Sequence, residues 1–115
     1  MGRSRYKFHE EYYPYFITST ILEELPLLSK PQLAQILLDQ LIFMQNEKGI
    51  KLYAYVIMPN HFHAIVQGTD LANSLRLTKS YSARKILQYL KQNGHTHWLN
   101  KLKWNKRIHK VGRTY

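Results

Sequence analysis

Two histidines separated by one residue are the part of this sequence best suited to chemistry. His61 and His63 flank Phe62 inside the apolar run from Tyr53 to Val66. Side chains alternate between the two faces of a β-strand, so the two imidazoles point the same way and Phe62 points into the opposite layer. Two imidazoles on one face can hold a divalent ion, which would polarise a phosphoryl oxygen. The spacing therefore predicts metal ligands, with an incidental pair of strand histidines as the alternative interpretation.

Charge is distributed unevenly along the chain, whose net charge is +10. The first 70 residues hold all seven acids and six basic residues, whereas the chain from Leu71 onward holds eleven basic residues and no acid. Basic residues interleaved with tyrosine and tryptophan suit a phosphate backbone with stackable bases. A solvated basic tail or a membrane-surface patch is the alternative. The candidate DNA contacts are Lys79, Arg84, Lys85, Lys101, Lys103, Lys106, Arg107, Lys110 and Arg113.

Length and composition fit one domain over residues 1–115, with a basic C-terminal segment over 94–115. The chain is 44% hydrophobic, which suffices for a single core at this length. It has no cysteine, so disulfides and thiolate metal sites are excluded. No apolar stretch is long enough to span a bilayer, and residues 1–13 lack the apolar core of a secretory signal. We therefore expect a cytoplasmic protein with no membrane partner.

The first half of the chain predicts a strand followed by a helix. Aromatic and β-branched residues predict a strand over Tyr12–Ile21. Ser29 starts a capping-box pattern with Pro31 in the first turn, and apolar residues at helical spacing predict a helix over Lys30–Lys48. Gly49 is expected to end that helix.

The second half predicts two strands and a second helix. Strands over Lys51–Met58 and His61–Gln67 flank the turn-favouring pair Pro59-Asn60, as a hairpin or a bulged pair of neighbours. Asp70 is placed to cap a helix that reaches about Asn93. This order predicts an α+β ferredoxin-like fold, an antiparallel sheet with two helices on one face. A fourth strand would have to come from residues 101–115.

The same residues resemble a known family. The segment Val56–Val66, VIMPNHFHAIV, is similar to the histidine–hydrophobic–histidine signature of the HUH single-tyrosine transposases. Its lead-in Met58-Pro59-Asn60 and the segment Lys79–Lys85, KSYSARK, resemble the REP-associated tyrosine transposase (RAYT) branch, and the Tyr15–Thr18 segment fits it as well. The resemblance runs over about 5–110.

The resemblance implies DNA transposition on single-stranded or hairpin DNA by a protein of the HUH fold. It implies that His61 and His63 bind Mg²⁺ or Mn²⁺ at the scissile phosphate. A tyrosine then attacks the phosphorus, forming a 5′-phosphotyrosine bond and releasing a 3′-hydroxyl. The chain is thus a transposase by resemblance, and a homodimer is left open as its assembly.

The nucleophile is where the chain departs from that family. The RAYT branch carries it on a further C-terminal helix, in a Tyr-Ile-x-x-Asn-Pro-Val-like segment that this sequence lacks. We therefore expect a fold that is incomplete at its C-terminus, in a chain that binds DNA without cleaving it. Tyr89 and Asn93 reproduce the Tyr-x-x-x-Asn spacing, but on a helix expected to pack on the core. Tyr81 is interpreted as a packing or DNA contact, and Tyr115 would serve only if the C-terminus folds back.

The sequence also leaves two further function classes open. One is a non-catalytic, ferredoxin-like nucleic-acid-binding module, as in sheet-based RNA binders. The other is a metal-binding structural protein, which the absence of acids after Asp70 disfavours. His95 and His97 repeat the His-x-His spacing but are expected to be exposed in a loop.

Overall fold

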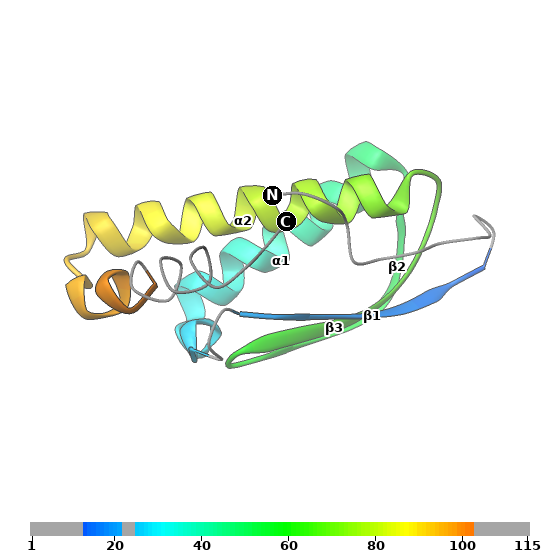
Figure 1. Cartoon of the computed structure of the whole chain (residues 1–115). Helices are drawn as coiled ribbons and strands as arrows, with labels where there is room; N and C mark the ends of the chain where they lie inside the picture. The colour runs from blue at the N-terminus through cyan, green and yellow to red at the C-terminus, as the bar shows by residue number, and fades with distance from the viewer. Residues whose placement is uncertain (1–12, 22–24, 103–115) are drawn as a thin grey trace, which may run out of the picture.

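The computed structural model describes residues 13–21 and 25–102, which form an antiparallel sheet with two helices packed across one of its faces (Figure 1). Residues 96–102 are also helical. This arrangement confirms the predicted α+β class and the predicted order of elements. The elements are β1 (Tyr15–Thr20), the 3₁₀ turn η2 (Leu27–Ser29), α1 (Pro31–Lys48), β2 (Lys51–Met58), β3 (His61–Gln67) and α2 (Leu71–Gln92).

The sheet has the strand order β1-β3-β2, so the histidine strand β3 lies in the middle and pairs antiparallel with both neighbours. The register of β2 shifts between Leu52 and Ala54, which places a bulge at Tyr53. The sequence left a hairpin or a bulged pair open for β2 and β3, and the structure has a hairpin that contains a bulge. The fourth strand expected over 101–115 falls outside the described residues, apart from residues 101–102, which are helical.

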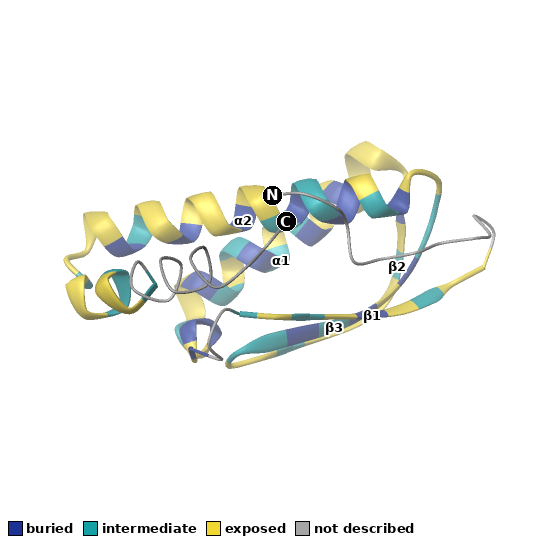
Figure 2. Ribbon diagram, viewed as in Figure 1, coloured by how far each residue is buried: buried dark blue, intermediate teal, exposed yellow. Residues whose placement is uncertain are grey.

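The core lies between the sheet and the helices, where Figure 2 shows the buried positions. Alternate residues of β3 are buried: Phe62 is 4% exposed, Ala64 1% and Val66 0%. They belong to one apolar cluster with the buried stripe of α1, whose predicted spacing is confirmed. Each large side chain buried in this way contributes about 1.5–3 kcal/mol. Because this core fixes one face of β3 inward, the residues between must point to the open face of the sheet.

The ends of α1 are partly as predicted. Pro31 occupies the first turn, and Gly49 ends the helix in the left-handed region with φ 67°. The N-cap is Lys30, and it makes no side-chain cap bond. The predicted capping box at Ser29 is wrong, because Ser29 belongs to the 3₁₀ turn and its hydroxyl donates to the carbonyl oxygen of Pro26 at 2.7 Å.

Helix α2 begins after Asp70, as predicted, but without the predicted cap hydrogen bond. Asp70 lies in the left-handed region with φ 52°, and its carboxylate accepts instead from the side-chain amide of Asn73 at 3.2 Å. The oxygen of Asn73 in turn accepts from Arg76 at 2.7 Å. No helix within the described ranges is long and apolar enough to cross a membrane.

Candidate metal centre

His61 and His63 lie together on the open face of the sheet, as the alternation predicted. Both are half-buried, and their ring centroids are 4.8 Å apart in an edge-to-face arrangement at 77°. A zinc–imidazole bond, for example, is roughly 2.0–2.1 Å long, so two rings at this separation are close enough to share one ion. In residues 13–21 and 25–102, no cluster of three or more His, Cys, Asp and Glu residues could hold a metal. The pair is therefore a two-donor set, which leaves most of an octahedral shell to water or substrate oxygens.

Each imidazole is held by a polar side chain from a different segment. Nδ1 of His63 lies 2.8 Å from Oγ1 of Thr18, its register partner on β1. Nδ1 of His61 donates to Oδ1 of Asn60 at 2.7 Å. The ring of Phe16 also stacks on His63, with centroids 5.2 Å apart and planes at 25°. With Nδ1 of both rings engaged, Nε2 is the nitrogen left to carry a ligand.

The turn that carries Asn60 is anchored on both sides by main-chain hydrogen bonds. The carbonyl oxygen of Asn60 accepts from the backbone N–H of Ile21 at 2.8 Å, just after β1. That of Pro59 accepts from the backbone N–H of Leu28 at 2.8 Å, in the buried 3₁₀ turn. The backbone of the turn before His61 is therefore fixed by contacts with two segments distant from it in the sequence.

Exposed aromatic rings share the open face with the histidines. Phe16 is 67% exposed, and its strand partner Ile65 lies two residues beyond His63 on the same side. Tyr53 is 56% exposed at the bulge, and its hydroxyl donates to Oε1 of Gln67, another open-face position. Sequence reasoning missed Phe16 and Tyr53 as members of this surface, together with Thr18 and Asn60. Alternation around the buried strand residues of β1 was the signal that could have found Phe16 and Thr18.

The basic candidates do not surround the histidines. Lys79, Arg84 and Lys85 lie on α2, in the helical layer behind the sheet (Figure 1). Arg84 sits over the ring of Tyr81 at 5.4 Å, and Tyr81 is 45% exposed. Lys101 is exposed in the helical residues 96–102. The remaining candidates, Lys103, Lys106, Arg107, Lys110 and Arg113, lie outside the described residues.

The described candidate tyrosines also lie away from the histidine face. Tyr89 is partly buried and packs against the core from α2, as expected. The side-chain amide of Asn93 donates to the carbonyl oxygen of Tyr89 at 2.9 Å, so the Tyr-x-x-x-Asn spacing here belongs to the end of a helix. Tyr81 points to solvent from the same helix, and Tyr115 lies outside the described residues.

The second His-x-His pair differs from its expected surroundings. His95 is half-buried and its ring stacks on Tyr89 with centroids 6.0 Å apart. His97 is exposed, but on the helical residues 96–102 instead of in a loop. The expectation of two exposed loop histidines is therefore right in part: His95 lies in the loop but is half-buried, and His97 is exposed but helical. The difference arises because a further helical segment follows Gly94, and Trp98 of that segment packs against the core.

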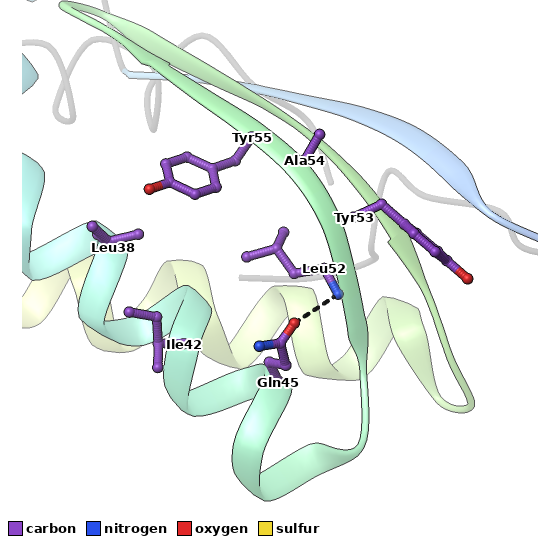
Figure 3. Close-up of a pocket in the computed structure, with 7 residues that line it drawn as sticks. All are labelled: Leu38, Ile42, Gln45, Leu52, Tyr53, Ala54 and Tyr55. Carbon is purple, nitrogen blue, oxygen red and sulfur yellow. Dashed lines mark hydrogen bonds between the residues drawn. The ribbon is translucent and has the colours of Figure 1, made fainter.

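A groove runs between α1 and β2, away from the histidines (Figure 3). Its volume is about 480 Å³, and Tyr55 and Leu38 face each other across it, while Tyr53 points to the other side of the sheet. Oε1 of Gln45 accepts from the backbone N–H of Leu52 at 3.1 Å and joins α1 to the edge strand. The lining has no charged or metal-ligating side chain, so the groove lacks the groups for phosphoryl chemistry. It is lined by Leu38, Ile42, Gln45, Leu52, Tyr53, Ala54 and Tyr55.

An antiparallel sheet covered by helices on one face, with a histidine pair on the other, defines the class of this protein as a two-layer α+β domain. A family model described as "Transposase IS200 like" matches residues 16–111, and the chain belongs to that family. A solved structure of a candidate transposase from Deinococcus radiodurans R1 shares the fold, with a TM-score of 0.61 and 21% sequence identity over 85% of this chain and 75% of that one. No curated protein matches the chain. Family membership connects the chain with DNA transposition and confirms the family-level resemblance seen in the sequence.

Proposed function

We propose that this domain is the metal- and DNA-binding part of a transposase of the HUH type and RAYT branch, acting on single-stranded or hairpin DNA. The observation that carries the proposal is the pair His61 and His63, side by side on the open face with both Nδ1 atoms held. Membership of the IS200-like family supports DNA as the substrate. A metal-binding structural protein unrelated to nucleic acid has no such support.

The open face offers the two kinds of contact that unpaired DNA requires. His61 and His63 would hold Mg²⁺ or Mn²⁺, and the bound ion would polarise a phosphate oxygen. The exposed rings of Phe16 and Tyr53 lie on the same face, and bases that are not paired can stack on such rings. A single strand lying across β3 would thus meet both the ion and the aromatic surfaces.

We propose that the described residues bind DNA but do not include the nucleophile that cuts it. Tyr81 and Tyr89 lie on α2, behind the sheet, so neither hydroxyl is held in line with a phosphate at the histidines. Correct positioning of the attacking group accounts for a large part of the rate of such reactions. The nucleophile is therefore expected from outside the described residues.

The test measures whether Mn²⁺ strengthens binding to a labelled DNA hairpin with single-stranded flanks. Three proteins are compared by fluorescence anisotropy with Mn²⁺ and with EDTA: the wild type, the double variant His61→Ala/His63→Ala, and His97→Ala as a matched control. His97 is exposed and outside the site. We expect Mn²⁺ to tighten binding of the wild type and the control but not of the double variant.

Each other outcome has a definite meaning. An equal Mn²⁺ response in the double variant would remove the metal site. Binding that ignores Mn²⁺ in all three proteins would favour the non-catalytic nucleic-acid-binding module, for which the position of the basic residues on α2 is the supporting observation. A Mn²⁺-dependent covalent adduct on a denaturing gel would show a nucleophile within the chain, and Tyr81→Phe, Tyr89→Phe and Tyr115→Phe would then identify it.

A further inference from the structure

We infer that Asn60 and Thr18 are positioning residues that set the tautomers of the two histidines. Each accepts a hydrogen bond from Nδ1–H, so that the lone pair of Nε2 is presented by both rings on the open face. The inference rests on the proposed metal site, because a neutral imidazole binds an ion only through an unprotonated nitrogen.

The contact at His61 fixes the direction of its hydrogen bond. The partner atom is Oδ1 of Asn60, an amide oxygen, which can only accept, so Nδ1 of His61 must carry the proton. In a neutral ring this leaves Nε2 unprotonated. Asn60 is half-buried, and its backbone oxygen accepts from the N–H of Ile21, so the turn that carries its side chain is fixed independently of any ion.

The contact at His63 uses a hydroxyl, which can donate or accept. If Thr18 donated to Nδ1, the proton of His63 would sit on Nε2 and block the ligand position. An accepting hydroxyl gives both rings the same tautomer and one shared ligand direction. Phe16, two residues earlier on the same face of β1, also stacks on the His63 ring, with centroids 5.2 Å apart and planes at 25°, so that ring has a neighbour on its face as well as at Nδ1.

The two positioning residues, Thr18 and Asn60, lie in separate segments and contact different rings. Thr18 lies 45 residues from His63 and meets it through strand pairing, whereas Asn60 is the immediate neighbour of His61. Partners that orient metal-binding histidines typically change metal affinity by about 10–100-fold when removed. The effect of each positioning residue should therefore appear at its own ring.

The experiment pairs a variant that removes the acceptor with one that keeps it. Thr18→Val loses the hydroxyl at nearly constant shape, and Thr18→Ser retains it. Asn60→Leu loses the acceptor oxygen, and Asn60→Asp retains one. Two quantities are measured for each protein: the imidazole ¹⁵N chemical shifts without metal at alkaline pH, and the dissociation constant for Mn²⁺ by electron paramagnetic resonance.

We expect the Nδ1–H tautomer at both rings in the wild type, in Thr18→Ser and in Asn60→Asp. Thr18→Val should move His63 alone toward Nε2–H, Asn60→Leu should move His61 alone, and each should weaken Mn²⁺ binding by about 10–100-fold. The wild-type ¹⁵N shifts decide the matter even if a variant fails to fold. Nε2–H tautomers in the wild type would overturn the inference whether or not Mn²⁺ binds. The expected tautomers with no Mn²⁺ binding would instead overturn the proposed function and leave the positioning intact.

Discussion

At the scale of single residues, the buried side chain of Ser82 lowers the stability of the protein. It is 5% exposed on the inner side of α2, and its hydroxyl oxygen has no hydrogen-bond partner among the described residues. Ser74 and Thr78, two turns and one turn earlier, are also buried, so a stripe of hydroxyls enters the apolar interior there. A buried hydroxyl without a partner carries its full desolvation cost.

Replacing Ser82 by alanine should therefore stabilise the protein. We expect Ser82→Ala to raise the free energy of unfolding by about 1 kcal/mol, because the unpaired oxygen is removed. The measurement is urea denaturation followed by circular dichroism. Ser80→Ala, at an exposed position of the same helix, is the matched control and should show only the gain of a few tenths of a kcal/mol from helix propensity. Equal gains from both variants would contradict the argument from burial.

The histidine pair could be predicted from the sequence, but the hydrogen bonds that hold the two rings could not. Alternation along a strand is a local rule, so His61 and His63 were correctly placed on one face and Phe62 on the other. The contact of Thr18 with His63 depends on the register between two strands distant in sequence, which the core selects. Asn60 was visible in the sequence beside His61, yet the hydrogen bonds that fix its turn come from elsewhere in the chain.

At the scale of elements, α2 has one side buried in the core and one side exposed to solvent. Its inner side packs on the core, and its outer side presents Tyr81, Arg84 and Lys85 to solvent, with no acid between Leu71 and the last described residue. A surface of this composition would bind a phosphate backbone and release counterions as it did so. DNA affinity contributed by α2 should thus be separable from ion binding at the histidines.

Charge reversal on α2 should reveal that separation. We expect Arg84→Glu/Lys85→Glu to reduce the slope of log affinity against log salt by about 0.7 for each phosphate of a single strand that the variant no longer neutralises, with Mn²⁺ affinity unchanged. The measurement is a salt titration of DNA binding. Lys48→Glu/Lys51→Glu, at the end of α1 and the start of β2, changes the net charge by the same amount and is the matched control. A slope that falls as much in the control would show that total charge, and not the face of α2, governs binding.

Element boundaries were predicted well where periodicity controls them and poorly where side-chain hydrogen bonds do. Both strands of the hairpin have the predicted bounds, and Gly49 ends α1 because its left-handed φ suits a residue without Cβ. Ser29 and Asp70 lie close to the predicted N-termini of α1 and α2, but neither side chain makes a cap hydrogen bond. The Ser29 hydroxyl donates to Pro26, and the Asp70 carboxylate accepts from Asn73. A capping residue has several nearby hydrogen-bonding choices, and the surrounding backbone decides among them.

At the scale of the whole molecule, the described sheet has two edges, β1 and β2, around one central strand. The histidines sit on that central strand, while Thr18 comes from one edge and Asn60 from the turn that joins the other. The hydrogen bonds that hold the two rings therefore form only when the sheet and this turn are assembled. The candidate ligands thus both lie on β3, whereas the side chains that hold their rings come from β1 and from the turn before β3.

Because the histidines lie on the central strand, binding of an ion to them should be coupled to folding. An ion that binds only the assembled sheet draws the folding equilibrium toward it by mass action, so Mn²⁺ at ten times its dissociation constant should add about 1.4 kcal/mol to the free energy of unfolding. Thermal melting of the wild type with and without Mn²⁺ measures this linkage, and His61→Ala/His63→Ala should melt at the same temperature in both solutions. A wild-type melting temperature that stays constant as Mn²⁺ saturates the site would mean that the ion binds the unfolded chain equally well. The histidines would then be ligands that require no sheet to bring them together.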